Sequence, residues 1–512
     1  MDLAFMKTRS VIRCRLCTHI KLLRLCSGPT NEDVKLNDIS RYEPSLSAKF
    51  TQEDIQSIVN FGRGNHLGNL KVPAVALPPV IVDAVNDLLY AQKGLFKVIK
   101  RDAATLDAYL KSRTAPYLNP SQTKFNKNQW KAKMMARLEA LDADLTPGQQ
   151  QMYAEEIETE GERRRIELKQ MSGFWKSISY DSHNACLAYT LCRAAPNYAV
   201  AIRILSEIAR RDPSFSPEAV LDFGSGCGSL VWSLLAMWPQ ETKFFYLNDV
   251  SNEFNNVASS ILSGDDVDFN PIANGIYFKQ HLPADVRPNF DLVFCGYTLS
   301  ELNGPGSRLA AIKHMLKCTK SYIVFVENGT LRSHHLMEEV REYVASNFAD
   351  QFEIFAPCPH LKPCPLLLTN LKQQRKSLIC RTSVTYLPFP VRNHTKPNAS
   401  SEQFTYLVFR RKPSDDLVSQ KEDDAEMRWP RVVQPPRIGT GHVTLRLCSS
   451  DGTASQSIVS KGKYPSFFYL MCKKINLGDR LPLPSLEAFE IESESVSSVD
   501  DEVEGNNDGG AE

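Results

Sequence analysis

A glycine-rich segment between two acidic residues has the make-up of a nucleoside-binding loop. Residues 220–229 read VLDFGSGCGS, so that Asp222 precedes three glycines at alternate positions, and Asp249 follows in YLND at 246–249. Glycines permit a tight turn and let backbone N–H groups approach a ligand that a Cβ atom would block. An acid after the next strand can accept hydrogen bonds from both ribose hydroxyls of an adenosine. The residues expected to bind such a cofactor are Asp222, Gly224, Ser225, Gly226, Gly228 and Asp249.

The spacing of these glycines favours S-adenosylmethionine over a dinucleotide. The dinucleotide fingerprint needs glycine at the sixth position of G-x-G-x-x-G, where this chain has Ser229. A second interpretation is a loop that preserves the fold but holds no ligand, and both interpretations stay open.

The segment that follows a later apolar run shows no recognisable methyl-transfer chemistry. Residues 294–302 read FCGYTLSEL, without the Asp/Asn-Pro-Pro-aromatic motif with which amine methyltransferases orient their substrates. Cys295 also lacks the neighbouring proline expected of a nucleophilic cysteine in this loop. A buried thiol is more often a small apolar side chain. We therefore assign no catalytic residue.

Four cysteines have the spacing and surroundings of a metal or iron–sulfur site. Cys358 and Cys364 stand in APCPHLKPCP at 356–365, with Cys380 sixteen residues later and Cys448 in GHVTLRLCSSDG at 441–452. Four thiolates can enclose Zn²⁺ or an iron–sulfur cluster. The C-x5-C spacing is wider than the C-x2–4-C usual for zinc fingers, so iron–sulfur ligation is at least competitive.

Other assignments of these thiols stay open. The chain has thirteen cysteines, and the four could be independent buried thiols. His360 and His442 are alternative ligands, and Cys472 is the main rival to Cys448. An odd number of cysteines spread over a long chain argues against a disulfide framework.

Strands alternate with helices from about residue 180 onward. The expected strands are 219–223, 244–247, 291–295 and 322–326, and the expected helices are 229–238, 250–262 and 309–317. Such alternation predicts an α/β fold with a parallel sheet and helices on both faces. Strands at 352–355 and 404–409 should end the sheet, with the proline- and cysteine-rich insert between them.

The N-terminal third differs from this pattern. Residues 1–31 carry six Lys or Arg and one acid between Leu and Ile residues, which is the pattern of a mitochondrial presequence. A disordered basic terminus is the alternative. Residues 32–175 should form a mainly helical region.

The C-terminal part is also distinct. Residues 413–480 form a basic, proline-punctuated appendage with strands expected near 443–447 and 467–471. Residues 481–512 carry ten acids and no Lys or Arg, and we expect them to be disordered. No apolar run approaches the roughly 20 residues of a membrane-spanning helix, so no membrane association is expected.

The loop and the cysteines, in this order, resemble the mitochondrial methyltransferase-like protein 17 family, a group related to the small ribosomal subunit. The resemblance covers roughly residues 70–480. The matching segments are YDS at 180–182 with Arg193, Pro196 and Tyr198, LDFGSGCGS at 221–229, FDLVFCGYTLSEL at 290–302, ENGT at 327–330, APCPHLKPCP at 356–365, RWPR at 428–431 and GHVTLRLCSSDG at 441–452.

The resemblance implies a class I, Rossmann-like methyltransferase fold at 176–412, with the Cys-rich insert at 356–381. It further implies a [4Fe–4S] cluster on Cys358, Cys364, Cys380 and Cys448 that staples the insert to the appendage, and S-adenosylmethionine as a second cofactor of the glycine loop. The gap between Cys364 and Cys380 is longer than expected for the family.

The resemblance also implies a function. The protein should be an assembly factor in the mitochondrial matrix that binds the small ribosomal subunit and its rRNA as a monomer and has lost methyl transfer. The alternative is an active S-adenosylmethionine-dependent rRNA methyltransferase. Basic residues of the appendage would contact phosphates, with Trp429 as a stacking face. They are Arg410, Arg411, Lys412, Arg428, Arg431, Arg437 and Arg446.

Overall fold

The computed structural model describes most of the chain between residues 68 and 482. The described ranges are 68–112, 127–141, parts of 151–162, 178–239, 241–263, 275–369, 379–394, 398–412 and 429–482, without 93 and 465. The expected presequence, Arg428 and nearly all of the acidic tail lie outside the described residues.

An eight-stranded mixed sheet forms the centre of the molecule, in the order β3-β2-β1-β4-β5-β8-β6, and β7 pairs with β8 outside this path. Strands β1 to β5 pair in parallel, whereas β8 is antiparallel to β5, β6 and β7. The strands are β1 (Ala219–Phe223), β2 (Phe244–Asn248), β3 (Ile276–Lys279), β4 (Phe290–Gly296), β5 (Thr319–Asn328), β6 (Phe352–Ala356), β7 (Thr382–Tyr386) and β8 (Ser400–Arg411).

The position of β8 identifies the fold. One strand antiparallel to both neighbours, between the fifth strand and the last, distinguishes class I methyltransferases from the all-parallel dinucleotide-binding fold. The predicted α/β class I fold is therefore confirmed, whereas the structure does not establish a metal staple in the appendage.

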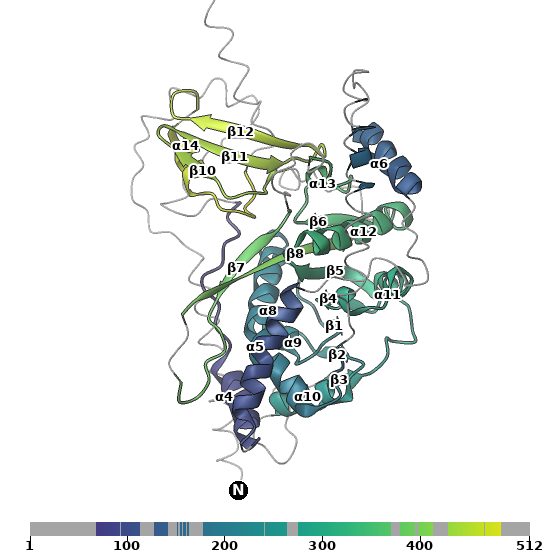
Figure 1. Ribbon diagram of the computed structural model, residues 1–512, viewed down its shortest axis with the longest axis vertical. Helices are drawn as coiled ribbons and strands as arrows, with labels where there is room; N and C mark the ends of the chain where they lie inside the picture. The colour runs from purple at the N-terminus through teal and green to yellow at the C-terminus, as the bar shows by residue number, and fades with distance from the viewer. Residues whose placement is uncertain are drawn as a thin grey trace, which may run out of the picture.

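Helices cover both faces of the sheet (Figure 1). One face packs against α4 (Pro79–Ala91), α5 (Phe96–Ser112), α8 (His183–Arg211), α9 (Ser229–Met237) and α10 (Asn252–Ser263). The other packs against α11 (Pro305–Cys318) and α12 (Leu331–Asn347). Two separate apolar cores result, and the central strands are buried on both sides. The body also contains α6 (Lys127–Leu141), the single turn η3 (Leu299–Glu301) and the short α13 (Pro365–Thr369).

The 29-residue helix α8 was not predicted from the sequence. Pro196 lies inside it, and proline normally ends or kinks a helix. The helix begins at a capping residue, because the Ser182 side chain accepts a hydrogen bond from the Ala185 N–H. Burial along most of its length compensates for the proline.

Residues 429–482 form a second, smaller unit, which we call the C-terminal module (Figure 1). Its sheet has the order β10-β11-β12, with β9 paired to β11. The elements are β9 (Arg431–Val432), β10 (Arg437–Gly439), β11 (His442–Cys448), β12 (Ala454–Ser460) and α14 (Ser466–Lys474).

The prediction of a strand near 467–471 is wrong, because these residues belong to α14. A run of five apolar residues fits a buried strand or a buried helix equally well. Phe468 and Cys472, one helical turn apart, pack with Val443 and Leu445 of the sheet, and this contact decides for the helix. None of the described helices is long and apolar enough to cross a membrane.

Candidate cofactor loop and cysteine cluster

The glycine loop connects β1 to α9 at the carboxyl edge of the sheet. Gly224, Gly226 and Gly228 have φ angles of 75°, 50° and 80°, in the left-handed region that favours glycine. A Cβ atom on Gly224 would lie 2.0 Å from the Thr298 hydroxyl oxygen. Strands β2 and β4 flank β1, so the loop, Asp249 and the segment after β4 meet at one edge. The sequence-predicted cofactor residues are thus brought together.

The Asp249 carboxylate binds the loop itself. One carboxylate oxygen accepts a hydrogen bond from the Gly226 N–H at 2.9 Å, and the other accepts one from the Ser251 N–H at 2.9 Å. Asp222 is 4% exposed at the bottom of the loop. Burial, with a contribution from the Asp249 carboxylate, raises the pKa of Asp222 to about 8.

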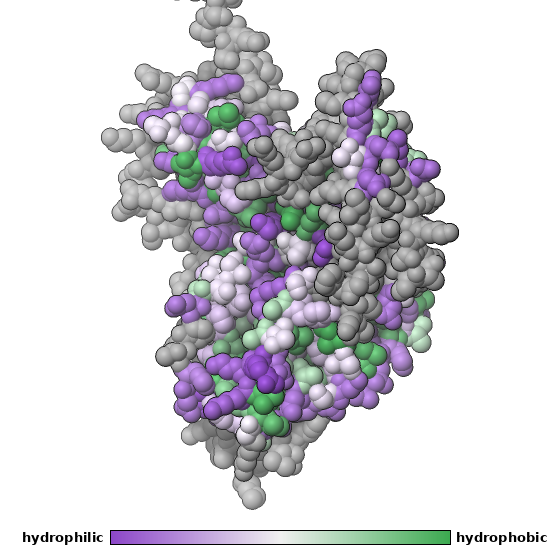
Figure 2. All heavy atoms as spheres, viewed as in Figure 1, coloured by the Kyte–Doolittle hydropathy of each residue, from purple (hydrophilic) through white to green (hydrophobic). Residues whose placement is uncertain are grey.

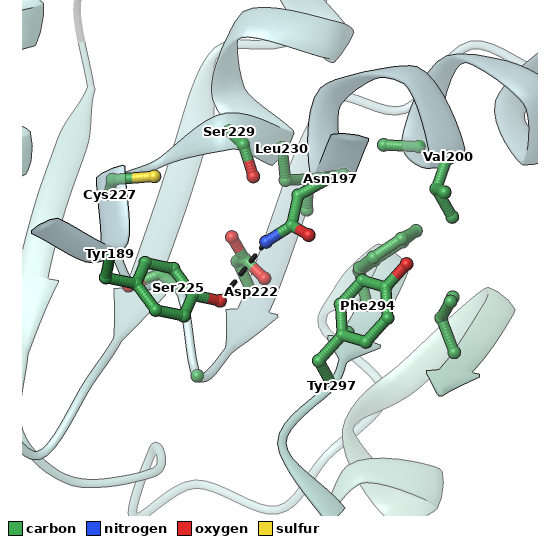
Figure 3. Close-up of a pocket in the computed structure, with 14 residues that line it drawn as sticks. Tyr189, Asn197, Val200, Asp222, Ser225, Cys227, Ser229, Leu230, Phe294 and Tyr297 are labelled. Carbon is green, nitrogen blue, oxygen red and sulfur yellow. Dashed lines mark hydrogen bonds between the residues drawn. The ribbon is translucent and has the colours of Figure 1, made fainter. Parts of the chain in front are cut away.

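A small cavity lies beside the loop (Figure 3). Tyr189, Asn197 and Tyr297 face it around Asp222, and Asn197 donates a hydrogen bond to the Tyr189 hydroxyl at 3.2 Å. Its volume is about 30 Å³. That volume holds only a few water molecules, whereas ligand pockets measure roughly 300–1,000 Å³. Asp249 is not among the residues that line this cavity, so the volume describes the space beside Asp222 rather than the whole candidate cofactor site.

Tyr297 lies directly after β4 and lines the cavity beside the glycine loop. It has a φ angle of 60°, which is uncommon for a residue other than glycine. Its hydroxyl group is buried and has no hydrogen-bond partner among the described residues. The Arg193 guanidinium lies 5.0 Å from the centre of its ring and pairs with Glu402 at 2.9 Å. An aromatic ring packed against a buried ion pair therefore forms part of the wall of the cavity.

Cys295 is completely buried in β4, between residues of the second apolar core. Burial raises the pKa of its thiol well above the usual value, which keeps it protonated and unreactive. This environment suits a small apolar side chain.

The four predicted ligand cysteines come together from distant parts of the chain. Cys358 follows β6, Cys364 precedes α13, Cys380 precedes β7 and Cys448 ends β11. Cys364 and Cys448 share one apolar group, against which Cys380 packs. The thiol of Cys380 forms a hydrogen bond with Cys358. This bond lowers the pKa of Cys358 below its usual value, although burial alone would raise it.

The three alternative ligands differ in whether they lie near the four cysteines. Cys472 is fully buried in the apolar core of the C-terminal module, and the ring of His442 contacts Thr440 at the exposed end of β11. His360, in contrast, places its Nε2 atom 3.3 Å from the Cys448 sulfur. Within the part of the chain that the structure describes, no group of three or more Cys, His, Asp or Glu side chains is arranged to hold a single metal ion.

The contribution of α12 to this cysteine cluster was not predicted from the sequence. Arg341 donates a hydrogen bond to the Cys358 sulfur at 2.7 Å, and the His334 Nε2 atom lies 3.4 Å from the Cys364 sulfur. The signal was present in the sequence as His334, Glu338 and Arg341, which helical spacing places on one face.

Of the basic residues expected to contact rRNA, Arg431 is buried, and Arg410 and Arg411 are half-buried and bonded within the protein, which corrects the expectation for these three. Arg431 is 3% exposed and pairs with Glu207 at 2.6 Å. Arg410 pairs with Glu353 at 2.6 Å, and Arg411 donates a hydrogen bond to the Thr319 carbonyl at 2.8 Å. The guanidinium of Arg480 lies 5.0 Å from the ring centre of Trp429. Arginine is as useful for interior ion pairs as for phosphate binding, and composition does not separate these roles.

One known protein family matches the part of the chain that contains both the glycine loop and the four cysteines. The family described as mitochondrial small ribosomal subunit Rsm22 matches residues 183–482, from α8 to the C-terminal module. This chain belongs to the Rsm22 family. The predicted relationship to the small-subunit methyltransferase-like group is confirmed.

Individual relatives of this Rsm22-family chain include a human protein and a fission-yeast protein. The human mitochondrial ribosome assembly protein METTL17 is 28% identical over 430 residues, which cover 83% of this chain and 86% of the relative. Rsm22-cox11 tandem protein 2 of Schizosaccharomyces pombe, a mitochondrial protein, is 23% identical over 351 residues. That match covers 61% of this chain and 44% of the relative.

Solved structures similar to this chain include magnesium protoporphyrin IX methyltransferase from Synechocystis with bound S-adenosylmethionine. It is 15% identical, with a TM-score of 0.27, and the match covers 48% of this chain and 91% of that one.

Proposed function

We propose that this Rsm22-family protein is an assembly factor of the mitochondrial small ribosomal subunit that acts in the matrix, binds rRNA and transfers no methyl group. The human relative, a mitochondrial ribosome assembly protein aligned with 83% of this chain, carries the assembly role. The family match supports the small subunit, because it extends over both the methyltransferase-like body and the C-terminal module. The missing acceptor-orienting motif after β4 and the Tyr297 ring, which Arg193 holds beside the glycine loop, support the lack of methyl transfer.

The four neighbouring cysteines are suited to bind a [4Fe–4S] cluster. They are Cys358, Cys364, Cys380 and Cys448. Three of these thiols are 4–6% exposed, and Cys380 is half-buried. Each thiolate of such a cluster binds a different iron, so the sulfurs need not converge on one point as the ligands of a single ion must. When bound, the cluster would supply a rigid cross-link from the insert to the end of β11.

Cys364→Ser tests this cross-link. We expect the variant to lose iron and to lose binding to the small subunit, because a hydroxyl group is a poor iron ligand and β11 is then released from the insert. Iron and sulfide content of anaerobically purified protein, and co-sedimentation with small subunits, are the measurements. Cys192→Ser, at a half-buried thiol of α8, is the matched control. Wild-type iron content and binding in Cys364→Ser would contradict the proposal.

The C-terminal module offers a positively charged surface for rRNA. Its exposed and half-buried cations are Arg437, Arg446, Lys461, Lys463, Lys473 and Lys474. Of its two acids, Asp451 is exposed and Asp479 is 1% exposed. Figure 2 shows hydrophilic residues interspersed with hydrophobic ones over this module. The excess of these cations over the acids favours contacts with phosphate groups.

One face of the module's sheet is the best candidate for this contact. Alternate residues of β11 and β12 pack against α14, and the intervening ones point to the opposite face. On that opposite face Arg446 pairs with Gln456, and Thr444 pairs with Ile458 and Arg437. Ile458 is 56% exposed, so the face is open.

Arg437→Ala/Arg446→Ala tests the rRNA contact. A plot of the logarithm of rRNA affinity against the logarithm of salt concentration has a negative slope. We expect this slope to become shallower by about two units in the variant, about one for each phosphate contact removed. Binding to a small-subunit rRNA fragment between 50 and 200 mM salt measures it. Lys97→Ala/Lys100→Ala removes two exposed charges from α5 as a control. An unchanged slope in the arginine variant would place the rRNA elsewhere.

The runner-up is an active S-adenosylmethionine-dependent rRNA methyltransferase. The retained loop favours it, because three left-handed glycines and two acids meet at the carboxyl edge of the sheet. Methyl transfer from labelled S-adenosylmethionine to subunit rRNA, abolished by a change in the loop, would move this function to first place.

A further inference from the structure

Helix α12 turns one polar face toward the cysteine cluster. His334, Glu338 and Arg341 are four and three residues apart, which places them on one side of the helix. Their exposed fractions are 3%, 6% and 4%. Buried polar side chains need partners, and the partners of these three lie in the Cys-rich insert.

Each of the three side chains contacts the insert. Arg341 donates through one Nη atom to the Cys358 sulfur at 2.7 Å and through the other to the Lys362 carbonyl at 3.0 Å. The His334 Nε2 atom is 3.4 Å from the Cys364 sulfur. Glu338 accepts a hydrogen bond from the Cys364 N–H at 3.2 Å. The helix therefore holds both the sulfurs and the backbone of the C-x5-C segment.

A third donor comes from inside the insert. The His360 Nε2 atom is 3.3 Å from the sulfur of Cys448, which belongs to the C-terminal module. A metal-bound thiolate can only accept hydrogen bonds, so in the iron-bound protein the Nε2 atoms of His334 and His360 would carry their protons. Three of the four sulfurs then each have a nitrogen donor from a different side chain.

We propose that α12, a helix of the methyltransferase-like body, supplies the outer hydrogen-bond shell of the iron–sulfur cluster, with Arg341 as its charge-compensating residue. This inference rests on the proposed [4Fe–4S] cluster. Four thiolates give a cluster a net negative charge, and a buried guanidinium beside one of them offsets it. Nearby positive charge and N–H···S bonds raise a cluster's reduction potential, and donors behind the ligands increase metal retention.

Arg341→Gln and Arg341→Lys test the inference on the iron-bound, full-length protein. We expect Arg341→Gln to lose iron to a chelator at least about tenfold faster and to have a lower reduction potential. Arg341→Lys keeps the charge and should lie nearer to the wild-type potential. Arg308→Gln is the control, because Arg308 is a buried arginine of α11 that pairs with Glu339 at 3.0 Å rather than with a thiol.

A purely structural role for Arg341 would lower stability without moving the potential. Wild-type potential and iron retention in Arg341→Gln would overturn the shell while leaving the cluster itself in place. His334→Phe removes only the hydrogen-bond donor to the Cys364 sulfur. If Arg341→Gln fails to fold, the reduction potential and iron retention are measured on His334→Phe instead. Wild-type protein purified without iron or sulfide would overturn the cluster and the shell together.

Discussion

Asp222 shows at the scale of one residue how burial changes the chemistry of the glycine loop. Its carboxyl group is buried and has no cationic partner among the residues that the structure describes. Desolvation disfavours the charged form, so the protonated form is stabilised and the pKa rises to about 8.

This pKa predicts a pH dependence of stability. The folded-state pKa lies above that of the unfolded chain, near 3.9, so the folded protein binds the extra proton between about pH 4 and 8. The stabilisation is present below the unfolded pKa and is lost as pH rises through this window. Asp222→Asn removes the effect, and its advantage over wild type should grow from pH 4 to 8, by at least about 1 kcal/mol.

Urea unfolding of both proteins at pH 5, 7 and 9 measures this difference. Identical pH dependence in the wild type and in Asp222→Asn would mean that the Asp222 carboxyl is not desolvated in solution.

The sequence reveals the residues of the loop but not the contacts of their neighbours. Asp222, Asp249 and the glycines are recognisable because their spacing is local. The left-handed Tyr297 and its cation partner Arg193 are not, because Arg193 comes from α8, about a hundred positions earlier. The same holds for Arg341, whose partner Cys358 belongs to the insert.

At the scale of elements, Glu207 of α8 joins the body to the C-terminal module. It is 1% exposed and accepts hydrogen bonds from Arg431 at 2.6 Å and from the Tyr406 hydroxyl at 2.8 Å. Arg431 also donates to the Pro357 carbonyl at 2.6 Å and the Gly478 carbonyl at 2.7 Å. One guanidinium thus connects α8, the insert and the module.

Arg431→Met should be strongly destabilising, because it removes this connection and leaves buried oxygens without a donor. We expect a loss of about 3 kcal/mol in the free energy of unfolding, and faster proteolysis between the body and the module. Arg437→Met, at an exposed position of β10, should stay within about 0.5 kcal/mol of wild type. Equal stability of the two variants would contradict the role of Arg431.

Periodicity predicted the elements of the sheet better than those around it. Strands β1, β2, β4 and β5 were recognised within a few residues, because each is a short apolar run between turn residues. Helix α8 was missed because of Pro196, and α14 was mistaken for a strand because five apolar residues carry no clear period. Strand β12 was missed because it reads ASQSIVS, in which only three of seven residues are apolar and they do not alternate with polar ones.

At the scale of the whole molecule, the cysteine cluster and Arg431 occupy the same junction. Cys448 pairs with Arg431 between β11 and β9, and Pro357 precedes Cys358. Cross-linking by iron and pairing with Glu207 would therefore fix the C-terminal module on the body together. If the proposed function holds, the methyltransferase-like fold would be a platform that presents the module to rRNA.

This arrangement was only partly accessible from the sequence. Spacing of glycines and cysteines, with the resemblance, predicted the fold and the family, which the strand order and the family match confirm. The division of basic residues between the interior and the surface required the structure, because Arg431 and Arg437 differ only in what surrounds them.

The most direct test of the central claim is the amount of assembled mitochondrial small subunit in cells whose only copy carries Gly226→Arg. A Cβ atom on Gly226 lies 3.8 Å from the Tyr189 ring, so the arginine should enter the cavity and block a cofactor. Gly306→Arg, where a Cβ meets no atom within 4 Å, controls for the added arginine, and Gly94→Arg, at a glycine with a φ angle of 81° and no atom within 4 Å, controls for the left-handed backbone. Protein level and iron content are measured alongside.

Normal assembly with Gly226→Arg is the predicted result, since the protein would act as an rRNA-binding scaffold without its cofactor loop. Failed assembly with Gly226→Arg, while that variant stays folded and iron-bound and Gly306→Arg assembles normally, would contradict the account and favour the active methyltransferase.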